Sequence, residues 1–209
     1  MEDKKDKQRS VSDEELLAQA KGGYKPAFDI FYERYKRRIL NYVYRMVGAR
    51  ERAEDIAQDV FIKAYLALGR YESRGKALHW LYTIAGNLCR NFARDNRLRP
   101  KLSLDKEVSL DETAEFYDIV ASEAENPRDI AVSKETEAIV HKHIMLLPEK
   151  YREVLVLCDI QGCSYEDVAS ILKCKIGSVG SRLSKARMLL AEKLKRYMGI
   201  NDLGSGTNG

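Results

Sequence analysis

Short polar and basic side chains recur along the C-terminal part of the chain, and residues of these types bind the phosphates and base edges of DNA. The candidates are Ser178, Ser181, Arg182, Ser184, Lys185 and Arg187. Apolar residues recur every three or four positions through the same segment, which predicts an amphipathic helix. At about 100° per residue, Ser181, Ser184 and Lys185 lie opposite the apolar stripe. The polar side of this helix could therefore enter a major groove.

A second, shorter helix is expected directly before the basic one. Ser164, followed three positions later by Asp167, resembles a capping box with aspartate in place of the usual glutamate. Residues 173–177 then break the apolar period, and Ser178 is expected to cap the basic helix. This segment, which ends at Arg196, predicts a helix-turn-helix, the arrangement that places its second helix on duplex DNA. The alternative is a solvated amphipathic helix whose charges have no specific partner.

An aromatic ring, an amide and basic side chains form a second candidate group. Tyr71 lies in an expected loop. The helix expected from about Ala77 to Asn96 has a polar side that carries Asn87, Arg90 and Arg94. Aromatic rings stack on unpaired bases, and amides hydrogen-bond to base edges. The group therefore suits single-stranded nucleic acid, whereas the alternative is an ordinary helical domain with a polar face.

The helix expected from about Glu51 to Leu68 has a mostly acidic polar side. Its outward residues are Glu54, Asp55, Gln58, Asp59 and Lys63. Its inward residues are expected to be Ile56, Ala57, Val60, Phe61, Ala64, Tyr65 and Leu68. Such a face is usually only solvated, and the alternative is a site for a protein partner.

The remaining patterns are also helical, so the chain is expected to be all-α, with two small helical domains joined by a flexible acidic linker. Ser12 to Glu15 spells a capping box at the start of the first domain, and aromatic residues between Pro26 and Gly48 keep the spacing of a core-facing stripe. In the second domain, helices are expected from Pro127 to Met145 and from Tyr151 to Asp159. The expected limits are 1–11 for a disordered N-terminus, 12–101 for the first domain, 102–127 for the linker, 128–198 for the second domain and 199–209 for a disordered tail.

The charge of the chain is unevenly distributed. The formal net charge is +4 over 209 residues, yet residues 102–140 carry eleven acidic and three basic side chains. The rest of the chain is therefore strongly basic, as expected of a protein that binds nucleic acid. The acidic linker could lie in positively charged channels of a partner or fold back over the protein's own basic surfaces, and we expect the second arrangement, as a weak autoinhibition.

Several classes of protein are disfavoured by what the sequence lacks. It has no run of about 18 apolar residues and no apolar signal-peptide centre, which predicts a cytoplasmic protein without direct membrane insertion. Cys89, Cys158, Cys163 and Cys174 are expected to be reduced and lack the spacing of a zinc site, although a redox role for the last three stays open. A glycine-rich phosphate loop and a serine with a catalytic base are also missing, so neither a cofactor nor enzyme activity is expected.

Three blocks of sequence together resemble a known family. They are residues 53–65 (AEDIAQDVFIKAY), 80–87 (WLYTIAGN) and 147–154 (LPEKYREV). Their order and separation, followed by a helix-turn-helix, are similar to those of extracytoplasmic-function (ECF) sigma factors of bacterial RNA polymerase. The resemblance covers about residues 16–194, and it is specific because the three blocks occur together.

The resemblance implies that the first domain is sigma region 2 and the second is region 4. Asp55, Gln58 and Asp59 match the segment that docks on the clamp helices of the largest polymerase subunit. Contacts with core RNA polymerase, including the flap of its second subunit, and inhibition by an anti-sigma factor are implied in the same way.

The resemblance also assigns tasks to the DNA-facing residues. Tyr71 and Asn87 match the positions that capture a flipped base of the minus-10 element, where the promoter strand is melted. Arg90 and Arg94 would hold the backbone of that strand. The buried anchor of the same helix is matched by Trp80 and Leu81.

The basic helix would then read the minus-35 element as duplex DNA. Gly180 stands where most relatives have arginine or lysine, so that a DNA contact could be lost and the first helical turn loosened. The predicted function is transcription initiation, in which the protein recruits core RNA polymerase and promotes promoter melting. The alternative is a stand-alone helix-turn-helix regulator that binds duplex DNA by itself, and in such a protein Tyr71 and Asn87 would have no task.

Overall fold

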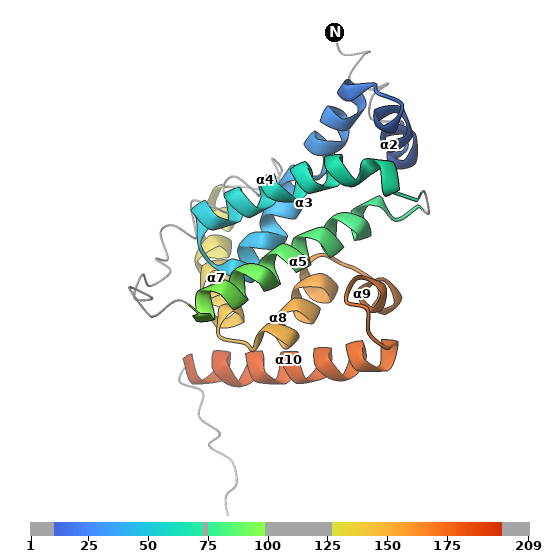
Figure 1. Cartoon of the computed structure of the whole chain (residues 1–209). Helices are drawn as coiled ribbons and strands as arrows, with labels where there is room; N and C mark the ends of the chain where they lie inside the picture. The colour runs from blue at the N-terminus through green and yellow to red at the C-terminus, as the bar shows by residue number, and fades with distance from the viewer. Residues whose placement is uncertain (1–10, 73–74, 99–126, 198–209) are drawn as a thin grey trace, which may run out of the picture. The chain divides into compact units, whose positions relative to one another are not determined.

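The chain folds into two helical units. The computed structural model describes residues 11–72, 75–98 and 127–197, and these residues form helices and turns without a strand. Contacts divide the chain after Leu104, with α2 to α5 in the first unit and α7 to α10 in the second (Figure 1). The all-α prediction is therefore confirmed. The expected linker, 102–127, lies almost wholly outside the described residues, so its weak folding back over basic surfaces stays a prediction.

The first helix, α2 (Asp13–Lys21), begins at the predicted capping box. The Ser12 hydroxyl accepts a hydrogen bond from the Glu15 N–H at 3.2 Å, and the Glu15 carboxylate accepts one from the Ser12 N–H at 3.2 Å. Asp13 accepts hydrogen bonds from Arg34 and Tyr35 of the next helix. Arg34 also donates from Nη2 to the Val11 carbonyl at 2.9 Å, so the start of α2 is fastened to its neighbour.

Three longer elements complete the first unit, and they pack against one another side by side (Figure 1). They are α3 (Lys25–Val47), α4 (Arg50–Ala67) with the short 3₁₀ turn η1 (Leu68–Arg70), and α5 (Ala77–Leu98). Pro26 lies in the first turn of α3. Gly48 ends the helix in a left-handed conformation with φ of 81°, which glycine adopts without steric cost. The aromatic stripe forms much of the core, where Tyr42 and Tyr82 are fully buried with ring centroids 5.1 Å apart.

One core prediction for α4 is wrong. Tyr65 was expected inside, but 40% of it is exposed, and its ring edge rests on Phe28 at a centroid distance of 5.1 Å. A tyrosine can cover a core at its rim while its hydroxyl stays in water, and periodicity alone does not distinguish this arrangement from full burial.

The second unit contains four helical elements. They are α7 (Pro127–Met145), α8 (Glu149–Leu155) continued by the π-helical turn η2 (Val156–Ile160), α9 (Tyr165–Ile171) and α10 (Ile176–Tyr197). The bounds of α7 agree with the prediction, whereas the expected helix from Tyr151 to Asp159 begins two residues earlier and widens at its end. In that wide turn the Gln161 N–H donates to the Val156 carbonyl, five residues back, at 2.9 Å.

Helix α10 packs against α7, α8 and α9. Its buried residues are Val179, Leu183 and Ala186, which belong to the predicted apolar stripe. At its far end the Tyr197 ring meets the His143 ring of α7 edge to face, with centroids 5.2 Å apart. Arg152 fastens the turn between α7 and α8, since its Nη2 donates to the carbonyls of Met145 at 2.7 Å and Leu147 at 3.0 Å.

Candidate nucleic-acid and polymerase interfaces

The helix-turn-helix begins as predicted. The Ser164 hydroxyl accepts a hydrogen bond from the Asp167 N–H at 3.2 Å and donates one to the Asp167 carboxylate at 2.7 Å. The helix that follows, α9, ends near Leu172, and Lys173 takes a left-handed conformation with φ of 50°. The turn is closed by the Cys174 N–H, which donates to the Ala169 carbonyl at 2.9 Å.

The predicted start of the basic helix is wrong by three residues, because Lys175 and not Ser178 precedes the helix. Helix α10 begins at Ile176, so Ser178 lies inside the first turn instead of capping it. The N–H groups of Ser178 and Val179 donate to the Lys175 carbonyl at 2.9 and 3.3 Å. Gly177 was expected to belong to the break, but a helix tolerates glycine in its first turn at small cost.

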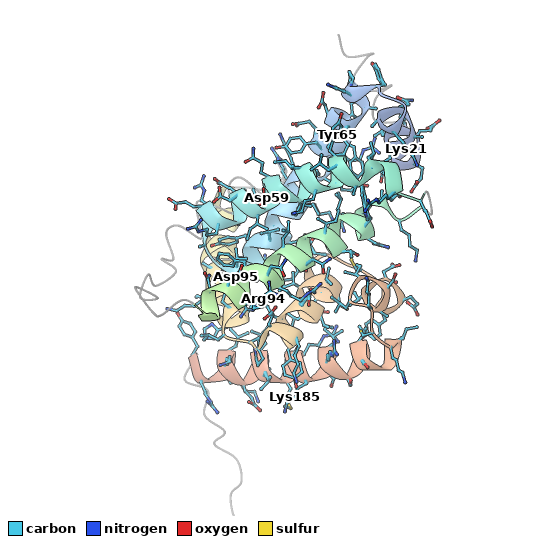
Figure 2. All side chains as sticks on the ribbon, viewed as in Figure 1. Lys21, Asp59, Tyr65, Arg94, Asp95 and Lys185 are labelled. Atoms are coloured by element: carbon cyan, nitrogen blue, oxygen red, sulfur yellow. The ribbon has the colours of Figure 1, made fainter. Side chains whose placement is uncertain are left out.

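The polar side of α10 faces solvent as predicted. Ser181, Ser184 and Lys185 are exposed, and Arg182 is partly exposed at the margin. Figure 2 shows Lys185 on the side of α10 that points away from α8 and α9. Together with Ser178, these side chains form a polar strip along one side of α10, and a major groove is wide enough to admit a helix that carries such a strip.

Arg187, the last of the predicted minus-35 contacts, forms an ion pair with Asp159 of the second unit. Its Nε and Nη2 donate to the two carboxylate oxygens of Asp159 at 2.9 and 2.6 Å, so the ion pair is bidentate. These hydrogen bonds raise the pKa of Arg187 and keep the guanidinium charged. A phosphate would therefore compete with Asp159 for this side chain, which the sequence did not indicate.

Gly180 faces its own unit. A Cβ at this position would lie 3.7 Å from Cε2 of Tyr165 in α9, which is ordinary van der Waals contact. Gly180, where arginine or lysine was expected, therefore lies beside the surface of α10 that packs on α9, and on the same side of α10 as Arg187.

Gly180→Ala is expected to stabilise the second unit by about 0.5 to 1 kcal/mol, because alanine favours a helix interior more than glycine does. Thermal or urea unfolding, followed for the second unit, measures this change. Gly177→Ala is the matched control, since a first-turn glycine is expected to give a smaller gain. A loss of stability in Gly180→Ala would show that Tyr165 cannot yield to the added methyl group.

A polar row runs along α5 in the first unit. Trp80, Asn87, Arg90 and Arg94 follow one another at spacings of seven, three and four, so they occupy roughly an 80° sector of the helix. Asn87 is exposed, and its amide oxygen accepts a hydrogen bond from Nη2 of Arg90 at 2.7 Å. The N–H₂ group of the same Asn87 amide can therefore donate to another partner. Arg94 points outward beside Asp95, with Nε 3.5 Å from its carboxylate (Figure 2).

Tyr71 stands beside the start of this row and is partly buried. Its hydroxyl donates to the Glu14 carboxylate of α2 at 2.7 Å, and its ring lies 4.6 Å from the Trp80 ring at an angle of 42°. Burial, followed by the hydrogen bond to Glu14, raises the pKa of Tyr71 above its ordinary value. Trp80 was expected to be buried together with Leu81, but only Leu81 is fully buried, whereas Trp80 is partly exposed with its ring beside that of Tyr71.

The outer side of α4 combines acid with exposed apolar surface. Asp55, Gln58 and Asp59 are exposed as predicted, and Asp59 points into solvent (Figure 2). Ile62 and Leu66 continue the row that Asp55 and Asp59 begin, and they are 50% and 78% exposed. These four positions lie within roughly 60° of one another around the helix. Ile62 and Leu66 were not predicted to belong to this face, although they lie three and seven residues beyond Asp59 on the same row.

No competing metal or thiol site emerges in the part of the chain that the structure describes. None of the four cysteines forms a disulfide, and no three metal-binding side chains gather there. Burial, with Asp159 nearby, raises the pKa of Cys158, which disfavours a reactive thiolate. None of the described helices is both long and apolar enough to cross a bilayer.

Comparison with known proteins identifies the two units. Residues 31–99 match Sigma-70 region 2, and residues 138–190 match Sigma-70 region 4. The RNA polymerase sigma-H factor of Pseudomonas aeruginosa is 37% identical over 88% of this chain and 94% of its own length. The ECF RNA polymerase sigma factor SigW of Bacillus subtilis is 35% identical over 86% and 95%. The ECF RNA polymerase sigma-E factor of Escherichia coli is 32% identical over 88% and 95%.

Solved structures agree on the fold. The structure of CnrH in complex with the cytosolic domain of CnrY matches with a TM-score of 0.64 at 22% identity, over 89% of this chain and 99% of that one. The sigma factor RpoE of Bartonella quintana, solved in complex with the anti-sigma factor NepR, matches with a TM-score of 0.59 at 24% identity, over 80% and 96%. Because both family regions occur in order and curated relatives align along nearly their full lengths, the chain belongs to the sigma-70 family, in its ECF group.

Proposed function

We propose that this sigma factor binds core RNA polymerase through α4, holds the melted minus-10 strand on α5 and reads the minus-35 duplex with α10. The observation that carries the proposal is the presence of two unlike polar faces in one chain, an aromatic and amide row on α5 and a serine and lysine strip on α10. The first suits splayed bases and the second suits a groove of duplex DNA. Such a protein needs no active site of its own and acts in the cytoplasm, where its polymerase is.

The polymerase face is proposed to be the α4 row. Asp55, Gln58 and Asp59 would bind the clamp helices of the largest subunit, with Ile62 and Leu66 supplying the apolar part of the contact. Exposed large aliphatic residues beside polar ones are typical of protein interfaces, where a few buried anchors carry most of the binding energy. A further contact of region 4 with the flap of the second subunit is proposed from the family.

The minus-10 face is proposed to be Tyr71 with the α5 row. Asn87 would hydrogen-bond to the edge of a flipped base while Tyr71 stacks on it, and Arg90 and Arg94 would bind the strand backbone. The existing hydrogen bond from Arg90 to Asn87 supports this division, since it orients the amide and leaves the guanidinium beside it.

The minus-35 face is proposed to be the polar strip of α10. Its members are Ser178, Ser181, Arg182, Ser184, Lys185 and Arg187. Within this set Lys185 and Ser181 are the readers at the centre of the strip, and Arg187 joins only if it releases Asp159.

An anti-sigma factor is the proposed inhibitor. Both solved structures named above contain a partner, the cytosolic domain of CnrY in one case and the anti-sigma factor NepR in the other. An inhibitor of this kind would act by covering the surfaces that the polymerase needs.

Run-off transcription separates this function from the alternative of a stand-alone helix-turn-helix regulator. The full chain added to core RNA polymerase should give discrete transcripts from genomic fragments, whereas core polymerase alone should not. A regulator would instead shift duplex DNA on its own and leave core polymerase without new start sites. Failure of the chain to associate with core polymerase would contradict the proposal.

Lys185→Ala should cost about 1 to 3 kcal/mol at one base pair of the minus-35 element if Lys185 reads a base, because the lost contact is base-specific. Binding to a panel of single-base variants of the duplex measures the cost. Lys195→Ala, an exposed lysine ten residues further along α10, is the matched control and should leave the base preference unchanged. An unchanged preference in both Lys185→Ala and Ser181→Ala would disprove this reading face.

Asp159→Ala should make duplex binding more salt-dependent. Without its carboxylate partner, Arg187 becomes available to a phosphate, and each added phosphate contact steepens the log–log salt slope by about 0.9. Fluorescence anisotropy across a salt series measures the slope. The double variant Asp159→Ala with Arg187→Ala should return to the original slope, and a steep slope there would exclude Arg187 as the cause.

A further inference from the structure

Glu14 of α2 contacts Tyr71, the residue proposed to stack on the flipped base. Its carboxylate accepts the hydrogen bond of the Tyr71 hydroxyl at 2.7 Å, although 57 positions separate the two residues in the chain. Tyr71 follows η1 in a connection between helices, where few backbone contacts fix a ring. Its orientation therefore depends on Glu14 at one end and on Trp80 at its side.

The position of Glu14 is itself well determined. The capping box at Ser12 and Glu15 sets the start of α2, and the neighbouring Asp13 accepts hydrogen bonds from Arg34 and Tyr35 of α3. The first turn of α2 thus presents two adjacent carboxylates, one bonded to the partly buried Tyr35 of α3 and one to Tyr71.

The contact with Trp80 limits where a base can stack. The two ring centroids are only 4.6 Å apart, which is less than the roughly 7 Å that a base would need to insert between two aromatic planes at normal stacking distances. A base must therefore stack on the outer face of Tyr71. The direction of that face is set by the Glu14 hydrogen bond.

We propose that Glu14 is a positioning residue for minus-10 recognition, which holds the Tyr71 ring in the orientation that receives the flipped base. This inference rests on the proposed function of Tyr71 and adds a residue outside the DNA-facing row. Pre-orienting the ring lowers the ordering cost that binding would otherwise incur. The raised pKa of Tyr71 agrees with this role, since the phenol stays protonated and keeps donating to Glu14 at neutral pH.

The test uses the full chain bound to core RNA polymerase. The probe is a fluorescent single-stranded oligonucleotide with the non-template minus-10 sequence of a promoter found by run-off transcription. A second set of oligonucleotides replaces one base at a time by an abasic site. Glu14→Ala should weaken binding of the natural strand about threefold to tenfold, the effect of one hydrogen bond, and should not weaken binding of the strand that lacks the stacked base.

Two further variants separate hydrogen bonding from charge. Glu14→Gln keeps an acceptor for the Tyr71 hydroxyl and should bind like the original protein, while Asp29→Ala removes an exposed carboxylate from the same unit and should have no base-dependent effect. Equal weakening on natural and abasic strands would overturn the proposal, because the role would then be structural. Tighter binding of Glu14→Ala to the natural strand would also overturn it, because Glu14 would then hold Tyr71 away from the base.

The same experiment distinguishes failure of this inference from failure of the proposed function. If no abasic site weakens binding of the original protein, and Asn87→Ala has no effect either, the α5 row does not bind the melted strand. If both effects are present and Glu14→Ala behaves like the original protein, only the positioning role is disproved.

Discussion

Asn87→Ala should lower the rate of promoter opening by the reconstituted polymerase about 5-fold to 150-fold, as expected for the loss of 1 to 3 kcal/mol of base-edge hydrogen bonding. The side chain is exposed, and Arg90 already occupies its carbonyl oxygen, so the amide N–H₂ is the group that would meet the base. Fluorescence of a base analogue placed in the minus-10 region reports the opening rate. Tyr71→Ala combined with Asn87→Ala should remove most of the remaining activity.

Asn96→Ala is the matched control for this substitution. Asn96 is an exposed asparagine on the same helix, nine residues further along and therefore on its opposite side. It should open promoters at the original rate. Asn87→Asp adds a second comparison, since it keeps an oxygen for Arg90 but removes the N–H₂ donor, and it should be as defective as Asn87→Ala. Normal opening by the Tyr71→Ala, Asn87→Ala double variant would refute the assignment of the α5 row.

Leu66→Asp combined with Ile62→Asp should weaken binding to core RNA polymerase by about a hundredfold or more, because interface anchors each contribute about 2 kcal/mol or more and a buried carboxylate adds a desolvation cost. Leu66 is the most exposed large apolar residue of the described chain, and Ile62 lies one turn before it on the same row as Asp59. Competition against a labelled sigma factor for core polymerase measures the loss.

Stability controls are simple for this pair because both side chains are exposed. The free energy of unfolding should change by no more than about 0.5 kcal/mol, as for most surface substitutions. Leu66→Met keeps the apolar surface and should bind normally, and Tyr24→Asp places the same charge at an exposed position outside α4. Undiminished binding by the Ile62, Leu66 double variant would show that the polymerase meets another face.

Local signals predicted the helices well because their causes are local. Ser12 and Ser164 cap the helices that follow them, and Gly48 ends α3, since each effect depends on residues within one turn. The start of α10 was missed because Ser178 is a good capping residue that lies three positions after the residue preceding the helix, Lys175. Lys173 follows the end of α9 in a left-handed conformation, which usually favours glycine or asparagine. A lysine at this position therefore did not indicate in the sequence where α9 ends.

The site was predictable in its exposed faces but not in its long-range contacts. Spacing alone placed Lys185 and Asn87 on polar sides, and the structure agrees. No pattern within one helix indicates that Arg187 bonds Asp159, 28 residues away, or that Tyr71 bonds Glu14, 57 residues away. Such pairs depend on how helices pack, and here they decide which of the proposed DNA-binding residues are already hydrogen-bonded within the protein.

The ring contact between His143 and Tyr197 lies at the end of α10 opposite to the turns proposed to read DNA. The contact holds the last turn of the helix against α7, while the residues that would read DNA lie near its first turns, about 20 to 30 Å away at 1.5 Å per residue. A tilt of about 6° at the held end would move those turns by roughly 3 Å, close to the rise of one base-pair step. If α10 reads the minus-35 duplex as proposed, its register on the DNA would therefore depend partly on an aromatic pair at the opposite end of the helix.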